Sequence, residues 1–276
     1  MERIPLRICM FSTGASSAYL LGYMIEEYGK ENVIPFFTDT LWEDEDNYRF
    51  MSEVLSYWDI EPVVYTDGRT PEETFFDRKF FGNFGTAPCS TDLKMKQTVI
   101  YVEELRLGGY EPILYFGIGY HERERAERIA NNYSHNCLEP VECQFPFAEE
   151  PMNKGRFSSV IEGKWRIKLP RMYLYGFEHA NCGGRCVKAG IRHYKLLYRV
   201  WPDRFLAQME MERKFRTEIN DYTLLKKSTG QKDAEGKTIY APYPLTQLHY
   251  DIKHLRNIQM DLFIDNREEI PCTCIA

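Results

Sequence analysis

Residues 6–17 read LRICMFSTGASS and join an apolar run to a turn of small residues. The run 6–12 predicts a short buried β-strand, and the turn leads into a helix from about Ser16 whose apolar positions recur every three or four residues. Backbone N–H groups at such a helix start suit an anion. A serine-rich helix start also occurs where no ligand binds, so the pattern alone leaves both interpretations open.

The same alternation of strand and helix continues along the chain. Further strands are expected at 33–38, 61–66, 112–118 and within 138–147, with helical patterns between them. This order predicts an α/β fold with a doubly wound, parallel five-stranded sheet, in which ligands bind at the carboxyl ends of the strands. Neither the Walker A pattern nor G-x-G-x-x-G is present, so a P-loop or a dinucleotide fold is not supported.

Composition and charge divide the chain. Its 276 residues are 43% hydrophobic and 28% charged, which excludes global disorder. Residues 1–150 carry 13 Lys and Arg against 27 Asp and Glu (−14), whereas 151–276 carry 22 against 14 (+8). We expect a nucleotide-binding α/β domain over 1–150 and a basic, mainly helical, cysteine-bearing extension over 151–276. No apolar run approaches the ~20 residues of a membrane helix, and no signal peptide is evident, so a cytoplasmic protein without membrane contact is expected.

The basic half contains a stripe that suits a polyanion. Lys188, Arg192, Lys195, Arg199 and Arg204 recur at helical spacing beside two tyrosines. Basic residues interleaved with aromatic rings are found in nucleic-acid-binding proteins. A solvated helix face would give the same pattern, so a nucleic acid partner is one of two interpretations.

Two close cysteine pairs point to a metal. Cys182 and Cys186 form one pair and Cys272 and Cys274 the other. Thiolates at such spacing suit an iron–sulfur cluster or zinc, and we expect a [4Fe–4S] centre with zinc as the alternative. Cys89 is a fifth candidate, either as a ligand or as a nucleophilic thiolate. The remaining Cys9, Cys137 and Cys143 are expected in the core.

The loop and the cysteine segments together resemble a known family. The loop 12–17 is similar to the S-G-G-x-D-S motif of the PP-loop ATP pyrophosphatase (adenine nucleotide α-hydrolase) superfamily, with Thr13 in place of glycine and Ser16 in place of aspartate. Within the superfamily the chain resembles the PAPS reductase-like family, of the stand-alone type found in bacteria and phages. The segments that carry this likeness are 37–44, 67–71, 88–94 and 176–190.

The resemblance implies an adenine nucleotide as partner and assigns residues to it. The expected nucleotide-binding residues are Ser12, Thr13, Gly14, Ala15, Ser16, Ser17, Thr38, Asp39, Gly117, Gly119 and His121. Ser17 and Cys89 are the expected catalytic residues, and the metal ligands would come from Cys89, Cys182, Cys186, Cys272 and Cys274, with His179 as a further ligand or neighbour. His121 is also explained as a helix cap. Asp39, Glu43 and Asp44 suit Mg²⁺ bound with ATP, although acidic residues at a helix start are also expected on dipole grounds.

These expectations define three functions. The first is an enzyme that adenylates an acceptor with ATP and then transfers sulfur from a cluster or a cysteine, served by a sulfur or electron donor protein. The second is a PAPS or adenylyl-sulfate reductase, although the C-terminal sequence PCTCIA departs from the Glu-Cys-Gly type of that family. The third is a nucleotide- or nucleic-acid-binding module with a structural zinc and no turnover.

Overall fold

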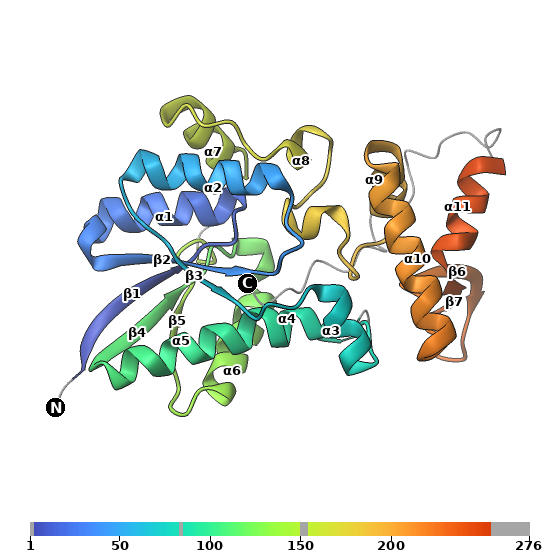
Figure 1. Cartoon of the computed structure of the whole chain (residues 1–276), viewed down its shortest axis with the longest axis horizontal. Coiled ribbons are helices and arrows are strands. Elements are labelled where there is room, and N and C mark those ends of the chain that lie inside the picture. The colour runs from blue at the N-terminus through green and yellow to red at the C-terminus, as the bar shows by residue number, and fades with distance from the viewer. Residues whose placement is uncertain (1–2, 83–84, 150–153, 255–276) are drawn as a thin grey trace. The chain divides into compact units, whose positions relative to one another are not determined.

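Five parallel strands form the central sheet of the molecule. The computed structural model describes residues 3–82, 85–149 and 154–254. The strands are β1 (Ile4–Met10), β2 (Val33–Asp39), β3 (Val63–Thr66), β4 (Tyr110–Tyr115) and β5 (Glu142–Gln144). Their order is β3-β2-β1-β4-β5, and every neighbouring pair is parallel (Figure 1). The predicted α/β fold with a doubly wound five-stranded sheet is confirmed. Because the strand order reverses between β1 and β4, the carboxyl ends of these two strands form the switch point at which such sheets bind ligands.

Helices cover both faces of this sheet. The helices along the chain are α1 (Ala15–Tyr28), η1 (Lys30–Asn32), α2 (Glu45–Trp58), α3 (Pro71–Arg78), α4 (Pro88–Ser90), η2 (Thr91–Met95), α5 (Lys96–Leu107), η3 (Tyr120–Glu122), α6 (Arg123–Asn136), α7 (Lys154–Ser158), η4 (Ser159–Lys164), α8 (Arg171–Leu174), η5 (Asn181–Gly184), α9 (Ile191–Val200), α10 (Pro202–Glu218) and α11 (Leu245–His254). Figure 1 shows α1 and α2 on one face of the sheet and α5 and α6 on the other. Among the described residues, no helix is both long and apolar enough to span a bilayer.

The alternation of side chains along β1 builds two cores. Cys9 and Phe11 pack with α1, α2 and η4, whereas Ile8 and Met10 pack with α5 and α6. Successive strand residues point to opposite faces of a sheet, which explains why a continuous apolar run is needed here. Cys9 and Cys137 are buried and Cys143 is half-buried. Burial raises the pKa of the Cys137 thiol to about 11, so these cysteines are packing residues, as predicted.

The chain divides into two compact units. The first contains the described residues up to Pro71 together with Cys89–Gly183, and the second contains Glu72–Pro88 and the described residues from Gly184 onward. In the second unit, α9 ends at Trp201–Pro202, where the sequence predicts a break, because proline fits the first turn of the next helix, α10.

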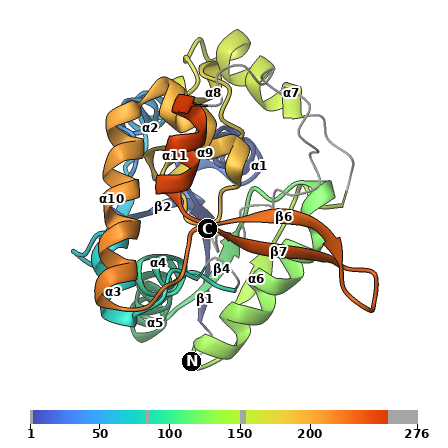
Figure 2. The ribbon, with the colours of Figure 1, turned by 90° about the vertical axis from the view of Figure 1, so that its right-hand side faces the viewer.

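A two-stranded antiparallel sheet also belongs to the second unit. The sequence predicts a turn-rich excursion over 228–237, and β6 (Leu225–Lys232) and β7 (Thr238–Tyr243) pair across this segment as a ribbon (Figure 2). The turn-rich prediction is therefore confirmed for 233–237 and wrong for 228–232, which belong to β6. Its polar sequence shows no apolar alternation, and the pairing rests on backbone hydrogen bonds, with Gly230 and Gly236 taking the left-handed conformations of a bulge and a turn.

A buried glutamate holds the ends of this ribbon in place. Glu212 on α10 is 1% exposed, and its two carboxylate oxygens accept the backbone N–H groups of Leu224 at 2.7 Å and Leu245 at 2.6 Å. Leu224 precedes β6, and Leu245 begins α11. Burial raises the pKa of Glu212, so the folded protein binds this proton more tightly than the unfolded chain does.

Replacing Glu212 is expected to change both the stability and its pH dependence. In the wild type, the contribution of Glu212 protonation to the free energy of unfolding is complete below the ordinary pKa of 4.5. It declines as the pH rises through the raised pKa of the folded state. Glu212→Gln removes this decline, but its amide offers one acceptor where two N–H groups point, so the free energy of unfolding at pH 5 should fall by about 1–3 kcal/mol. Denaturant unfolding across pH 4–8 measures both effects. Glu210→Gln, at an exposed residue two positions away, is the control; a pH profile of Glu212→Gln that parallels the wild type would contradict this account.

Candidate functional site

The loop between β1 and α1 has a strained backbone. Thr13 lies at φ 59°, in the left-handed region that a β-branched residue rarely adopts. Its side chain is 0% exposed, and its hydroxyl oxygen has no hydrogen-bond partner within the described part of the chain. Strain and an unsatisfied buried hydroxyl each cost stability, and strained residues cluster at functional sites.

Hydrogen bonds within the loop leave two amides free to bind an anion. The hydroxyl of Ser17 donates to the carbonyl of Gly14 at 3.0 Å and accepts the N–H of Ser12 at 3.2 Å, so Ser17 braces the loop. Ala18 N–H also bonds to Gly14, at 3.0 Å. The N–H groups of Ser16 and Ser17 donate to no acceptor among the described residues. Together with the helix dipole, these amides make the start of α1 a candidate anion site.

The tip of β4 reaches the same loop from the other side of the switch point. A Cβ on Gly117 would lie 2.9 Å from the carbonyl oxygen of Ser16 and 3.2 Å from the nitrogen of Ser17, so only glycine permits this approach. Around Gly119 the space is open. His121 is exposed in η3, and its ring packs edge-on against Tyr120. The structure therefore brings Gly117 to the loop at Ser16 and Ser17, whereas His121 faces solvent.

The glycine pair at the tip of β4 allows a matched test. Gly117→Ala is expected to lower the free energy of unfolding by about 1–3 kcal/mol, because the new methyl group meets backbone that cannot rotate away. It should also displace the amide of Ser17 and weaken anion binding. Gly119→Ala, which meets nothing within 4 Å, should leave the free energy of unfolding unchanged. Thermal unfolding and nucleotide titration of the two variants decide the point, and equal behaviour of the pair would refute the role given to Gly117.

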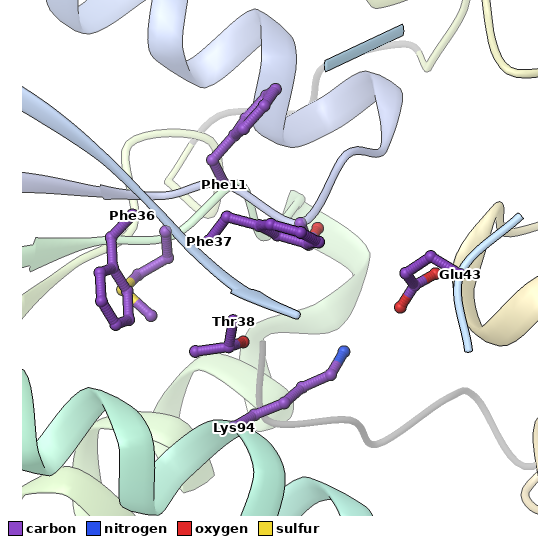
Figure 3. A pocket seen from close by; sticks show the side chains of 8 residues that line it. Phe11, Phe36, Phe37, Thr38, Glu43 and Lys94 are labelled. Carbon is purple, nitrogen blue, oxygen red and sulfur yellow. The ribbon is translucent and has the colours of Figure 1, made fainter. Parts of the chain in front are cut away.

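A pocket lies beside this loop at the ends of β1 and β2. Its lining residues are Met10, Phe11, Ser12, Phe36, Phe37, Thr38, Glu43 and Lys94. Figure 3 shows the ammonium end of Lys94 extending from below toward the side on which Glu43 lies, with Thr38 beside it. Lys94 is only 6% exposed and lies in the π-helix η2, where the wider turn interrupts the ordinary helical spacing. The pocket thus combines an apolar wall with one buried cation, and Lys94 was not predicted as a site residue.

The acidic residues after β2 are engaged by the protein itself. Asp44, 0% exposed, caps α2 by accepting the N–H of Asp46 and receives Nε and Nη2 of Arg171 at 2.8 and 2.9 Å. Glu43 accepts the backbone N–H of Cys182 at 2.8 Å. Asp39 uses one oxygen for the N–H of Leu41 and the hydroxyl of Tyr48, both at 2.8 Å.

These acidic side chains leave few donor atoms for Mg²⁺. Over the described ranges, no three His, Cys, Asp or Glu side chains gather as a metal-binding group. The carboxylates of Glu43 and Asp44 hold neighbouring segments of the chain, and only the second oxygen of Asp39 has no partner among the described contacts. A magnesium ion bound mainly by phosphates could therefore be coordinated here by one protein carboxylate, that of Asp39.

The helix α8, far along the chain, contacts the loop between β1 and α1. Arg171 and Tyr173 lie on α8, and the hydroxyl of Tyr173 accepts the N–H of Ala15 at 3.3 Å from a position 158 residues away. The backbone N–H of Arg171 donates to Asp46 at 2.6 Å. The hydrogen bond from Arg49, aided by this N–H, holds the pKa of Asp46 below its ordinary value. Tyr173 was not predicted as a site residue, since nothing local in residues 171–175 marks it as a partner of the first loop.

The expected metal ligands are only partly described. Cys182 is buried at φ 57° in η5, with its N–H fixed by Glu43, and Cys186 and Cys89 are half-buried. Cys272 and Cys274 lie outside the described residues. The iron–sulfur or zinc centre therefore stays a prediction, as does a role for His179.

The residues of the basic stripe and its tyrosines, in the second unit, are only partly exposed. Arg192, Lys195 and Arg199 are exposed on α9. Tyr194, however, is fully buried, and its hydroxyl donates to the carbonyl of Cys186 at 3.1 Å. Its ring is therefore a core residue that is unable to stack on a base, whereas the exposed cations remain compatible with a polyanion.

Fold and site together define an α/β protein with a candidate anion site at the switch point of a parallel sheet. No protein-family model and no curated protein matches the sequence. Among solved structures, the chain is similar to the phosphate complex of phosphoadenylyl-sulfate (PAPS) reductase from Candida auris. The two share 14% sequence identity with a TM-score of 0.41, over 63% of this chain and 78% of that chain.

Proposed function

We propose that the chain is an enzyme that binds an adenine nucleotide with a phosphate or sulfate group at the start of α1. The observation that carries this proposal is the loop itself. It leaves the amides of Ser16 and Ser17 without acceptors, lies beside a pocket that contains Lys94, and meets Gly117 at the switch point. Amides in the loop and a buried cation in the neighbouring pocket suit a tetrahedral oxyanion.

The resemblance to the PP-loop superfamily gains support from the backbone. Thr13 stands where the motif has glycine, and its φ of 59° is a conformation that glycine adopts without strain. The substitution thus keeps the loop shape although it changes the residue. This is a correspondence of conformation, which sequence spacing alone does not provide.

For the reaction, we propose first the reduction of an adenylyl sulfate. A cysteine thiolate attacks the sulfate sulfur, an S–S bond forms, the S–O bond to the phosphate breaks, and the nucleotide leaves with that electron pair. An external dithiol then attacks the cysteine sulfur, releases sulfite, and is itself oxidised to a disulfide. This chemistry needs no magnesium, which agrees with carboxylates at Glu43 and Asp44 that are engaged within the protein. Cys89 is the candidate thiolate, because it lies in α4, directly before η2 and Lys94.

The second candidate is ATP-dependent adenylation of an acceptor followed by sulfur transfer. Its support is Asp39, next to the pocket residue Thr38, with one carboxylate oxygen that has no partner among the described contacts. One carboxylate together with phosphate oxygens is a common way to hold Mg²⁺. A nucleic acid acceptor would use the exposed cations of α9, and an iron–sulfur centre on the predicted cysteines would supply sulfur or electrons.

One experiment separates these functions. Anaerobically purified full-length protein is analysed for iron, sulfide and zinc and titrated calorimetrically with ATP, adenylyl sulfate and PAPS. Product assays follow, with a dithiol present. Sulfite formation that is lost in Cys89→Ser supports the reductase, whereas AMP formation that depends on ATP and an acceptor supports adenylation. Failure of all three nucleotides to bind would overturn the proposed function.

A further inference from the structure

The hydroxyl of Tyr173 lies against the first residues of α1. Its oxygen accepts the N–H of Ala15 at 3.3 Å, and the backbone N–H of Ala180 also donates to it. A Cβ on Gly14 would lie 3.3 Å from this same oxygen, so the absence of a side chain at position 14 makes room for the phenol. Tyr173 therefore belongs to the immediate surroundings of the anion site.

The proton of this hydroxyl is available to a ligand. A phenol oxygen that accepts N–H groups still has its own O–H to donate, and no described residue accepts it. Burial raises the pKa of Tyr173, so the group keeps its proton at neutral pH. The buried hydroxyl of Thr13, on the same loop, likewise has no partner among the described residues. A ligand whose oxygens only accept hydrogen bonds would satisfy these two O–H donors and the two unsatisfied amides of Ser16 and Ser17.

The position of Tyr173 is held from both sides of α8. Arg171 is fixed to the buried Asp44 by two hydrogen bonds of 2.8 and 2.9 Å. On the other side, the side-chain amide of Asn47 donates to the carbonyl of Ala180 at 2.6 Å. Both anchors lie at the start of α2, so α2 positions the tyrosine relative to α1. This is the arrangement of a preorganised donor, which pays little entropy when a ligand binds.

We propose that Tyr173 donates its hydroxyl proton to the phosphate or sulfate oxygen that the start of α1 binds, and so acts as a specificity-determining contact for acceptor-only oxygens. This inference rests on the proposed function, because it concerns the same site. If the inference holds, the hydroxyl strengthens the binding only of ligands that have an anionic group. Adenosine, which has none, should bind equally well with or without it.

The test compares Tyr173→Phe with the wild type by calorimetry, using adenosine, AMP, ATP and adenylyl sulfate. The variant is expected to bind the three anionic ligands about tenfold more weakly, the effect of losing one hydrogen bond to a charged group, and adenosine unchanged. Tyr57→Phe, at an exposed tyrosine with no described hydroxyl hydrogen bond, is the matched control. If Tyr173→Phe proves unstable in thermal unfolding, Gly14→Ala, whose Cβ would lie 3.3 Å from the hydroxyl, shifts it slightly while the ring remains, and a smaller loss confined to the anionic ligands is expected.

The other outcomes overturn the inference in distinct ways. Tyr173→Phe could bind the anionic ligands as tightly as the wild type while Lys94→Met binds them more weakly. This result would refute the contact and leave the proposed function intact. Tighter binding in Tyr173→Phe or Tyr173→Ala would show that the phenol blocks the site. If the wild type binds none of the four ligands, the proposed function fails and the inference fails with it.

Discussion

Replacing Lys94 by methionine is expected to weaken nucleotide binding roughly 10- to 100-fold. Lys94 is 6% exposed and is the cation that lines the pocket together with Ser12 and Thr38. A hydrogen bond between charged groups contributes about 1.5–3 kcal/mol, and the low local dielectric around a buried lysine keeps salt from screening it. Methionine has a similar length and fills the same space without charge.

Calorimetric titration with ATP and adenylyl sulfate measures this loss, and ligand-induced shifts in melting temperature provide a second readout. Lys96→Met is the control, because Lys96 is exposed at the start of the next helix, α5, and contributes nothing to the pocket. Lys94→Arg should retain part of the affinity, since the charge remains although its geometry changes. Wild-type affinity in Lys94→Met would mean that the anion binds elsewhere.

The elements of this site differ in how far the sequence predicts them. The run 6–12 and the small residues after it predict β1, the loop and α1, because a buried strand and a helix start each have a local signal. The same holds for β4 and Gly117. Since the ends of parallel strands meet at one edge of a sheet, local signals were sufficient to bring these pieces together.

The residues that complete the site have no such local signal. Arg171 meets Asp44 across 127 positions and Cys182 meets Glu43 across 139, and only the folded chain determines these pairs. An acidic stretch such as Glu43-Asp44 reads equally well as a cation site or as a set of structural anchors. Lys94 lies in the segment 88–94 that carries the family likeness but was not assigned to the site, and its place in the π-helix η2 departs from ordinary helical spacing.

The pair formed by Asp44 and Arg171 is expected to be the most sensitive point for stability. Asp44→Ala removes the cap of α2 and the partner of Arg171 at a fully buried position, so the free energy of unfolding should fall by about 3 kcal/mol. Asp44→Asn keeps a capping oxygen and loses the charge, and should cost about half as much. Because Arg171 also fixes α8, both variants should weaken nucleotide binding through Tyr173.

Denaturant unfolding and calorimetry of Asp44→Asn, Arg171→Met and the double variant separate these contributions. A coupling energy above about 0.5 kcal/mol identifies the ion pair as the source, since independent sites add to within that margin. Glu45→Ala, at the exposed neighbour in the first turn of α2, should change stability by only a few tenths of a kcal/mol. If Asp44→Asn loses stability but binds nucleotide like the wild type, α2 holds α8 without positioning Tyr173 for the ligand. This result would contradict a role of the Asp44–Arg171 pair in nucleotide binding.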